Sequence, residues 1–388
     1  MRRRPDLAYN WQGCIMGALE HRVAPLPRWR AERFGRLAPY GALFLCLAAV
    51  AAFFAAYDAL ERPIGVAAGA PAAVSAALTR GDAAILVVKP GFGVSDVARE
   101  LLACGFDVDE RLFRLGSRWF GLDRRIQAGE YSVRAAMSTR TLFDLFRRGE
   151  VVQYRVTIPE GFTAKEIASR LAAHGLVAKD RFLKLVGRPE LVFPGGLPEE
   201  LKGITSLEGY LYPDTYVFTG VSSEEDIART MVKRFLEVAL PLYHKSSLAG
   251  SHSLGDLVTL ASIVEGEAAV DRERPVIAGV FLNRLERRMP LESCATVEYA
   301  LGVHKEVLSL KDVAVDSPYN TYRNLGLPPT PIANPGRKSL AAAMNPARGV
   351  PYLFFVARGD GSHVFSRTFA EHRRAQAAVA DLTREPRH

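Results

Sequence analysis

The sequence predicts an α+β protein with a single N-terminal transmembrane helix, an α+β subdomain, and a mostly helical domain that contains a small β-sheet. Three observations lead to this fold class. Residues 37–57 carry no charged side chain, a strand–turn–helix pattern occurs twice in the region that follows, and the last part of the chain combines helical periodicity with one β-hairpin pattern.

The uncharged segment, residues 37–57, is long enough to cross a bilayer, because a hydrocarbon core about 30 Å thick needs about 20 apolar residues in a helix. A cleaved signal peptide would have a shorter apolar stretch close to the N-terminus. Here residues 1–36 precede the segment. The sequence therefore predicts an uncleaved anchor that lies in the lipid bilayer.

Charge asymmetry predicts the orientation of this anchor. Residues 1–36 hold eight arginines against three acidic residues, whereas Asp58 and Glu61 follow the span. Because positive residues stay on the cytoplasmic side, residues 1–36 are expected to form a cytoplasmic Arg-rich arm, with the rest of the chain outside. The arm holds most of the formal net charge of +8, so nucleic acid is not an expected partner of the outer part.

The first outer region contains an internal repeat. Residues 58–82 are rich in Ala, Gly and Pro and are expected to be a linker. Residues 84–106 and 154–176 then each show a β-branched strand, a Pro/Gly turn and a helix that ends at glycine. Residues 83–202 are expected to form an α+β subdomain, either as two βα units without a binding role or as a carbohydrate-binding module of the LysM type.

A second outer domain is expected over residues 203–388. Its helices are predicted at residues 223–239, 254–268, 271–288, 338–344 and 369–382, and its β-hairpin at residues 352–366. In the subdomain before it, a strand is predicted around residues 129–133 and a helix around residues 139–148.

The chain lacks several sequence motifs that are typical of catalytic, metal-binding or phosphate-binding sites. It has no GxSxG elbow, no HExxH, no phosphate-binding loop and no CxxC pair. The eight histidines are scattered, and His363 is expected to face outward from the hairpin. We therefore expect neither a metal site nor a cofactor.

One carboxylate stands out on an apolar helix. Residues 257–264 are almost wholly apolar, and Glu265 follows them directly. Partial burial would raise the pKa of Glu265 and keep it protonated near neutral pH, as a general acid requires. Glu267 is expected to point elsewhere and to be solvated. The alternative is that Glu265 is an ordinary charge at a helix end.

Two loops are rich in residues that contact sugars. Residues 207–216 include Glu208 and Tyr210, and residues 317–322 include Asn320 and Tyr322. Aromatic faces stack on pyranose rings, and Asn or Glu side chains hydrogen-bond to hydroxyl groups. Such loops can also simply pack on a domain face. Together with the anchor and the candidate acid, they favour an extracellular polymer, namely peptidoglycan, as the substrate.

These segments resemble a known family in order and spacing. The motifs are IPEGFTAKEIASRL, SLEGYLYPDTYVF, TLASIVEGEA, RPVIAGVFLNRLERRMPL, ATVEYAL, SPYNTYRNLGLPPTPIANPG and PYLFFVARGDGSHVFSRTFAEH. Over about residues 85–385 the chain resembles the endolytic murein transglycosylases, the MltG or YceG-like family. The resemblance implies that Glu265 is the catalytic residue. It also places Glu208, Tyr210, Asn320 and Tyr322 near a substrate-binding groove.

The resemblance further implies a bacterial inner-membrane protein with a cytoplasmic N-terminus, a LysM-like subdomain and an extracytoplasmic catalytic domain. Its activity would be that of a lytic transglycosylase, a lyase that cleaves the MurNAc-β-1,4-GlcNAc bond of nascent glycan strands, forms 1,6-anhydro-MurNAc ends and terminates elongation. The expected partners are peptidoglycan glycan strands, the lipid bilayer and cell-wall synthases. The chain departs from the family pattern at Glu292 and Cys294, where many relatives carry Gln and Asp.

Two other functions stay open at this point. One is a muramidase that hydrolyses the same bond with Glu208 or Asp214 as its second carboxylate, since ordinary glycosidases need two. The other is a non-catalytic glycan-binding scaffold for cell-wall synthases.

Overall fold

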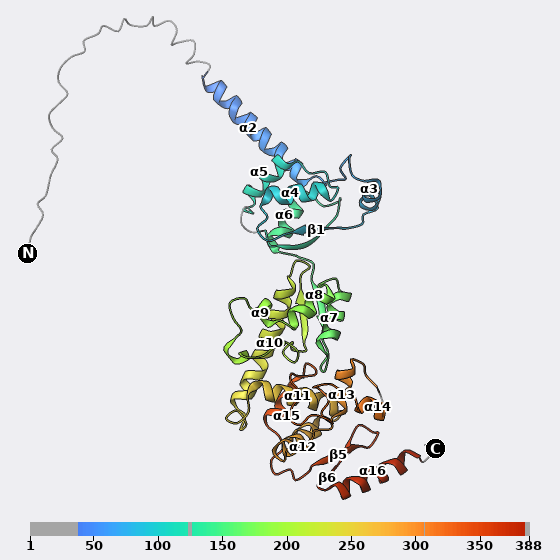
Figure 1. The fold of residues 1–388 in the computed structure, drawn as a ribbon. Coiled ribbons are helices and arrows are strands. Elements are labelled where there is room, and N and C mark those ends of the chain that lie inside the picture. Colours follow the sequence, from blue (N-terminus) through green and yellow to red (C-terminus); the bar gives the residue numbers. More distant parts are fainter. Residues whose placement is uncertain (1–37, 123–125, 306, 385–388) are drawn as a thin grey trace, which may run out of the picture. The chain divides into compact units, whose positions relative to one another are not determined.

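The computed structural model describes residues 38–122, 126–305 and 307–384 of the chain (Figure 1). The chain divides into two compact units, Met1–Arg62 and Pro63–His388. In the first unit the structure describes helix α2 (Ala38–Glu61), in which a window of 18 residues has a mean hydropathy of 2.1. This helix is long and apolar enough to cross a membrane. It contains the predicted span except for Leu37, and the predicted arm 1–36 lies outside the described residues.

The structure differs from the sequence prediction in the segment expected to be a linker, residues 58–82. Helix α2 continues to Glu61, and helix α3 (Ala72–Thr79) occupies the middle of the segment. Isolated β-bridges join Pro63 to Ser138 and Val66 to Phe106. The alanine-rich composition that suggested a flexible linker also favours helix formation, and burial of Leu78 fixes α3 to its unit.

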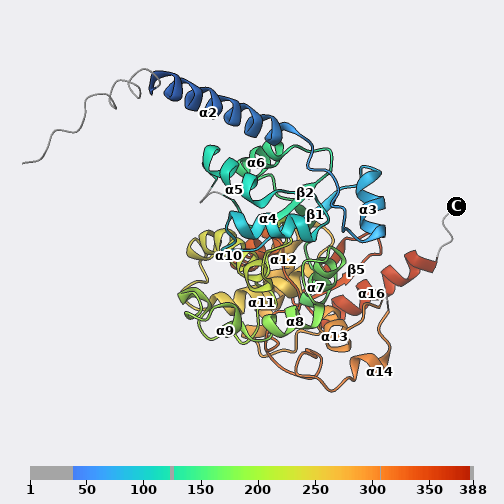
Figure 2. The same ribbon diagram turned by 90° about the horizontal axis from the view of Figure 1, so that it is seen from above.

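The first copy of the repeat, residues 84–106, supplies the first strand and the first helix of a strand–helix–helix–strand arrangement (Figure 2). Its elements are β1 (Ala84–Val88), α4 (Val94–Ala103), α5 (Glu110–Trp119) and β2 (Gly129–Val133), followed by α6 (Thr139–Arg148). β2 pairs antiparallel with β1. The predicted strand and helix in this region are confirmed. The LysM-like character of the subdomain stays a prediction.

The second copy of the repeat, residues 154–176, supplies the first strand and the first helix of the next group of elements, which has a separate sheet. Its elements are β3 (Tyr154–Thr157), α7 (Ala164–Ala173), α8 (Lys179–Val186), α9 (Pro189–Val192), the 3₁₀ helix η2 (Glu199–Leu201) and β4 (Thr215–Phe218). β4 pairs antiparallel with β3. The predicted domain boundary at 202/203 therefore falls inside this unit. One apolar core runs across the boundary, because an isolated strand pair needs the following helices to cover it.

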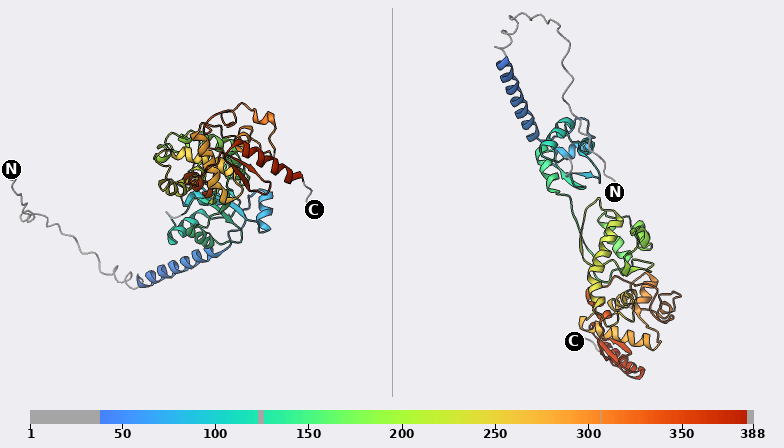
Figure 3. Two further views of the ribbon diagram at one scale, coloured as in Figure 1. Left: turned by 90° about the horizontal axis from the view of Figure 1, so that it is seen from below. Right: turned by 90° about the vertical axis from the view of Figure 1, so that its left-hand side faces the viewer.

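The remaining elements are mainly helical, as predicted. They are α10 (Glu224–His244), α11 (Leu254–Glu267), η3 (Asp271–Glu273), α12 (Arg274–Glu286), α13 (Cys294–Leu301), α14 (Leu310–Val313), α15 (Arg337–Met344), β5 (Phe354–Ala357), β6 (His363–Ser366) and α16 (Phe369–Arg384). Helices α11, α12 and α15 pack on one another (Figure 1). The hairpin β5–β6 forms as predicted and packs against α16, drawn in red in Figure 3.

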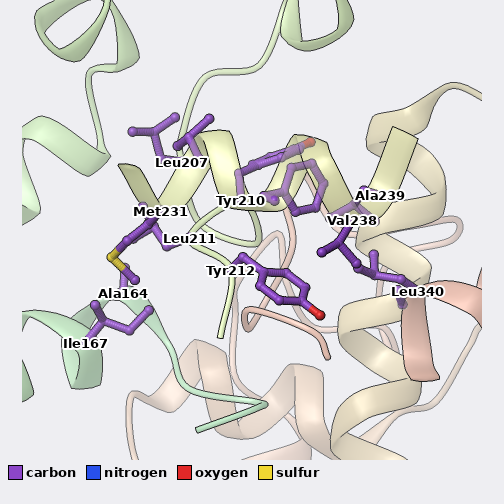
Figure 4. Close-up of a cluster of buried hydrophobic side chains, with 14 of the residues drawn as sticks. Ala164, Ile167, Leu207, Tyr210, Leu211, Tyr212, Met231, Val238, Ala239 and Leu340 are labelled. Carbon is purple, nitrogen blue, oxygen red and sulfur yellow. The ribbon is translucent and has the colours of Figure 1, made fainter. Parts of the chain in front are cut away.

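The core explains why α11 is apolar on every side. Its residues 257–264 are all buried, and neighbours on several helices surround them. A helix that is apolar all round is a buried helix. Ser253 caps its first turn and accepts a hydrogen bond from the backbone N–H of Asp256. Tyr210 and Tyr212 lie in the same core, with Leu340 of α15 and Val238 of α10 nearby (Figure 4).

Candidate active site

The turn between β3 and α7 forms one wall of the site. Gly161 adopts a φ of +79°, a left-handed conformation that suits glycine. Thr163 then caps α7 in a capping box with Glu166. The backbone N–H of Gly161 donates to the carbonyl of Asn334, and the N–H of Asn334 donates to the carbonyl of Phe162. These two bonds fix the turn beside the segment that leads into α15.

Glu265 lies in the last turn of α11, directly after the buried stretch. Its side chain is 8% exposed. The backbone N–H of Gly336 donates to Oε2 at 2.9 Å, and Nη1 of Arg274 donates to Oε1 at 3.2 Å. The carboxyl group is therefore largely buried and held by two donors from separate elements, α12 and the start of α15.

Arg274 is the ion-pair partner of Glu265 and is itself buried. Its Nη1 also donates to Oγ of Ser339 at 2.6 Å, and its Nε donates to Oδ1 of Asp271 at 3.1 Å. A cation in the first turn of a helix is unfavourable by itself, because the helix dipole is positive there. The two carboxylates compensate for it. The ion pair also holds Glu265 in one orientation.

Glu265 nevertheless faces a cleft. The cleft has a volume of about 1310 Å³, which exceeds the roughly 300–1,000 Å³ of pockets that bind drug-sized ligands. Its walls come from the β3–α7 turn, the outer face of α7, part of α8, the end of α11, and α13 with the loop after it. A cleft of this size suits a polymer segment better than a small molecule.

A second carboxylate, Glu160, lines the same cleft near Glu265. It comes from the β3–α7 turn and is exposed. Burial of part of the side chain, followed by the negative charge of Glu265, raises the pKa of Glu160, while Arg274 opposes the shift. The cleft therefore offers two carboxyl groups with different surroundings: one is ion-paired and buried, the other faces solvent.

Glu208 reaches the cleft wall but is 5% exposed. Both of its carboxylate oxygens accept from the backbone N–H of Ala164, and Nδ2 of Asn334 donates to Oε1 at 2.9 Å. Burial raises its pKa to about 7, although these hydrogen bonds and that of Tyr299 act in the opposite direction. Glu208 thus joins α7 to the segment before α15 at the wall of the cleft.

Glu267 differs from the expectation that it would be solvated. Oγ of Ser293 donates to its Oε1 at 2.6 Å, and burial raises the pKa of its carboxyl group. The helix ends at this residue, so its side chain turns toward the start of α13 instead of toward water. Cys294 lies next to Ser293 in the cleft wall, with its Sγ 3.4 Å from the hydroxyl of Tyr322.

The other predicted substrate-binding residues are not grouped around Glu265. Tyr210 is 2% exposed and packs edge-on against Phe235 in the core. Asn320 is fully buried, and its Nδ2 donates to the carbonyls of Val313 and Val315, which stabilises its own loop. Tyr322 is half-buried beside Cys294. These three residues therefore support the framework of the site in this structure.

Two more residues, Asp214 and His363, lie in surroundings that differ from those expected from the sequence. Asp214 is paired with Arg234 at 2.8 Å and is not among the residues that line the cleft. His363 does not face outward, because its Nδ1 lies 2.8 Å from Oε2 of Glu273 and its side chain is 6% exposed. The hairpin packs on α12 through Phe355 and Phe281, which brings this face of β6 inside. Among the described residues, no group of three or more His, Cys, Asp and Glu side chains is arranged to hold a metal ion.

Sequence reasoning missed Glu160, Arg274 and Asn334. Each had a local signal. Glu160 is a carboxylate between Pro159 and Gly161 just before a helix, and Arg274 is a cation at a helix start, where only a nearby anion makes it favourable. Asn334 lies two residues before Gly336, the N-cap residue of α15. The Asn334 side chain instead bridges Glu208 and the carbonyl of Phe162.

The geometry defines a class of site. A buried, oriented carboxylate and a solvent-facing one share a large cleft, and carboxyl groups in contrasting surroundings carry out general acid–base catalysis. The fold and the site together indicate an acid–base enzyme with a polymer-sized groove.

Comparison with known proteins gives the family. Residues 86–378 match the YceG-like family. The chain is similar to the endolytic murein transglycosylase of Bacillus subtilis (strain 168), with 33% identity over 300 residues that cover 74% of this chain and 82% of the relative. It is also similar to the endolytic murein transglycosylase of Streptococcus pneumoniae (strain ATCC BAA-255 / R6), with 31% identity over 275 residues. That match covers 64% of this chain and 50% of the relative, so the chain spans about half the length of the pneumococcal protein.

A solved structure agrees with this result. The crystal structure of a YceG-like protein from Listeria monocytogenes superposes with a TM-score of 0.51 and 36% sequence identity, and the match covers 76% of this chain and 99% of that one. The chain therefore belongs to the YceG-like family.

Proposed function

We propose that this protein is a membrane-anchored lytic transglycosylase that cleaves nascent peptidoglycan strands internally. The observation that carries the proposal is the carboxyl group of Glu265, fixed by Arg274 and Gly336 at the wall of a polymer-sized cleft. The names of the relatives, endolytic murein transglycosylases, support the same substrate and reaction.

The reaction breaks the β-1,4 bond between N-acetylmuramic acid and N-acetylglucosamine without adding water. Glu265 protonates the leaving oxygen, and the acetamido carbonyl of the substrate stabilises the electron-poor anomeric carbon. Glu265, now a carboxylate, then removes the proton of the muramoyl C6 hydroxyl, which closes a 1,6-anhydro ring. The attacking group is already part of the substrate, so no water molecule has to be positioned.

The proposal locates this activity at a membrane. Helix α2 can cross a bilayer, and the arginines of residues 1–36 favour a cytoplasmic N-terminus. The catalytic region would then face the outside of a bacterial inner membrane, where glycan strands are made. Cutting a strand there terminates its elongation, and cell-wall synthases are the neighbours that this role requires.

The test is replacement of Glu265 by Gln in the full-length protein, purified in detergent and incubated with uncrosslinked nascent glycan. We expect strand cleavage to be lost while the unfolding temperature and glycan binding are kept. Glu200→Gln, at an exposed position outside the cleft lining, is the matched control and should cleave normally. Near wild-type cleavage by the Glu265→Gln variant would refute the assignment.

A muramidase is the second candidate, and Glu160 is the observation that favours it, because it gives the cleft the second carboxylate that hydrolysis requires. Mass spectrometry of the wild-type products separates the two reactions. Ends with 1,6-anhydromuramic acid support the transglycosylase, and reducing ends support hydrolysis. Binding to glycan strands without any new chain ends would support a scaffold instead.

A further inference from the structure

Glu160 and Glu265 meet at one residue, Gly336. The backbone N–H of Gly336 donates to Oε2 of Glu265 at 2.9 Å. On its other side, Gly336 lies so close to Glu160 that a Cβ atom added there would be 2.0 Å from the Glu160 carboxyl carbon. Gly161 provides a further link, because a Cβ atom on it would lie 3.5 Å from Cγ of Glu265. The carboxyl groups of Glu160 and Glu265 therefore lie close to each other, with Gly161 and Gly336 beside them.

Gly336 is needed here for space and not for its backbone conformation. Its φ of −75° and ψ of 171° are available to any residue. A side chain would have to displace either the Glu160 carboxyl group or the turn that carries it. The absence of a side chain at position 336 thus allows both carboxyl groups to occupy one end of the cleft.

The carboxyl groups of Glu160 and Glu265 differ in whether a cation is paired with them. Glu265 has the buried guanidinium of Arg274 as its ion-pair partner. Within the described part of the chain, Glu160 has no hydrogen-bond or ion-pair partner and faces the cleft. The charged or titratable groups around Glu160 are Glu265 of α11, Arg274 of α12, Lys338 of α15, Asp271 of η3, and Tyr212.

The arrangement favours a proton on Glu160. Partial burial and the charge of Glu265 raise the pKa of Glu160, and the cations Arg274 and Lys338 only oppose this shift. Lys338 is in addition paired with Asp271, which limits its effect. Two neighbouring carboxyl groups do not readily ionise together, and the one without a cation partner keeps the proton more easily.

We propose that Glu160 is a second catalytic residue of this cleft, which donates the proton to the leaving oxygen while the ion-paired carboxylate of Glu265 accepts the proton of the attacking hydroxyl. This inference rests on the proposed function and divides between two side chains the two steps that were assigned above to Glu265 alone.

The steps balance in atoms and charge. The proton of Glu160 passes to the glycosidic oxygen as the C1–O4 bond breaks and the released N-acetylglucosamine end gains a hydroxyl group. The muramoyl C6 oxygen forms the new bond to C1, and its proton passes to Glu265. Transfer of one proton from Glu265 back to Glu160, directly or through water, restores the starting state.

The first test compares cleavage of nascent glycan by full-length wild type, Glu160→Gln and Glu160→Asp between pH 5 and pH 9. A general acid contributes about 10²–10⁴-fold, so Glu160→Gln should lower the rate at pH 7 by at least about 100-fold. The dependence of the remaining activity on pH should differ from that of the wild type, because the group that carries the proton in the wild type is gone. Glu160→Asp keeps a carboxyl group and should recover part of the rate. Glu200→Gln is again the control.

The second test moves the Glu160 carboxyl group without removing it. Gly336→Ala should also lower the rate by at least about 10-fold, because the new methyl group overlaps Glu160. Unfolding temperature and glycan binding of every variant are measured in parallel. A Glu160→Gln protein that binds glycan and cleaves within about threefold of wild type, with an unchanged pH profile, overturns the inference and leaves the proposed function intact. If the wild type itself forms no new chain ends, the proposed function fails.

Discussion

Replacement of Glu208 by Gln is expected to stabilise the protein increasingly as the pH rises. The wild-type carboxyl group is 5% exposed, and burial raises its pKa from an ordinary value of 4.5 to about 7. Between these two values the folded protein holds a proton that the unfolded chain has already lost. The wild type therefore loses stability as the pH rises through this range.

The size of the effect follows from the shift. One pKa unit corresponds to about 1.4 kcal/mol, so a change from 4.5 to about 7 corresponds to about 3 kcal/mol in total. Most of it, about 2.5 kcal/mol, is expressed between pH 5 and pH 8. Gln has no such titration. It can still accept the hydrogen bond from the backbone N–H of Ala164, so α7 keeps its attachment to the loop.

The assay is urea unfolding followed by far-UV circular dichroism at pH 5, 6, 7 and 8. The difference in free energy of unfolding, variant minus wild type, should increase by about 2.5 kcal/mol from pH 5 to pH 8. Taking the difference removes the contribution of every other titrating group. Glu200→Gln, at an exposed position, is measured in parallel as the control for removal of a carboxyl group. A flat or decreasing difference for Glu208→Gln would refute the assignment of a neutral, buried carboxyl group at position 208.

Two further predictions concern the framework of the site. Arg274→Met leaves Glu265 buried without its cation and should cost about 3–5 kcal/mol of unfolding free energy. Urea unfolding checks this, and a loss no larger than that of Glu200→Gln would contradict it. Gly209→Ala should destabilise the protein by at least about 1 kcal/mol more than Gly203→Ala. Both glycines have φ near +90°, but only at Gly209 would the new Cβ meet the Pro331 ring, at 2.3 Å, so similar unfolding temperatures for the two variants would argue against this close approach.

Local sequence patterns were sufficient for most individual elements. The apolar stretch of α11 and its cap at Ser253, the hairpin β5–β6 and the helix α6 depend on side-chain periodicity and on capping residues close in sequence. Such signals predict structure well because the interactions that produce them are made within a few residues. Membership of the YceG-like family likewise followed from motifs that are contiguous in the chain.

Contacts between distant residues were not predictable in this way. The pairing of β3 with β4 crosses the boundary expected at 202/203, because a strand carries little information about its partner. Glu208 was expected near a substrate-binding groove, and it lines the cleft. Its burial was not predictable, because its hydrogen-bond partners Ala164 and Asn334 are far from it in sequence. Tyr210 and Asn320 became framework residues for the same reason.

The sequence by itself determined that this chain has a membrane-spanning candidate helix, a repeated strand–helix unit, and a carboxylate that directly follows an almost wholly apolar stretch. Only the tertiary structure decided what surrounds that carboxylate. Glu265, Arg274, Gly336 and Glu160 come from four separate elements, and their electrostatic interaction depends on distances that exist after the chain has folded. The sequence determines whether a side chain can carry a charge, whereas the fold determines its solvation and its neighbours.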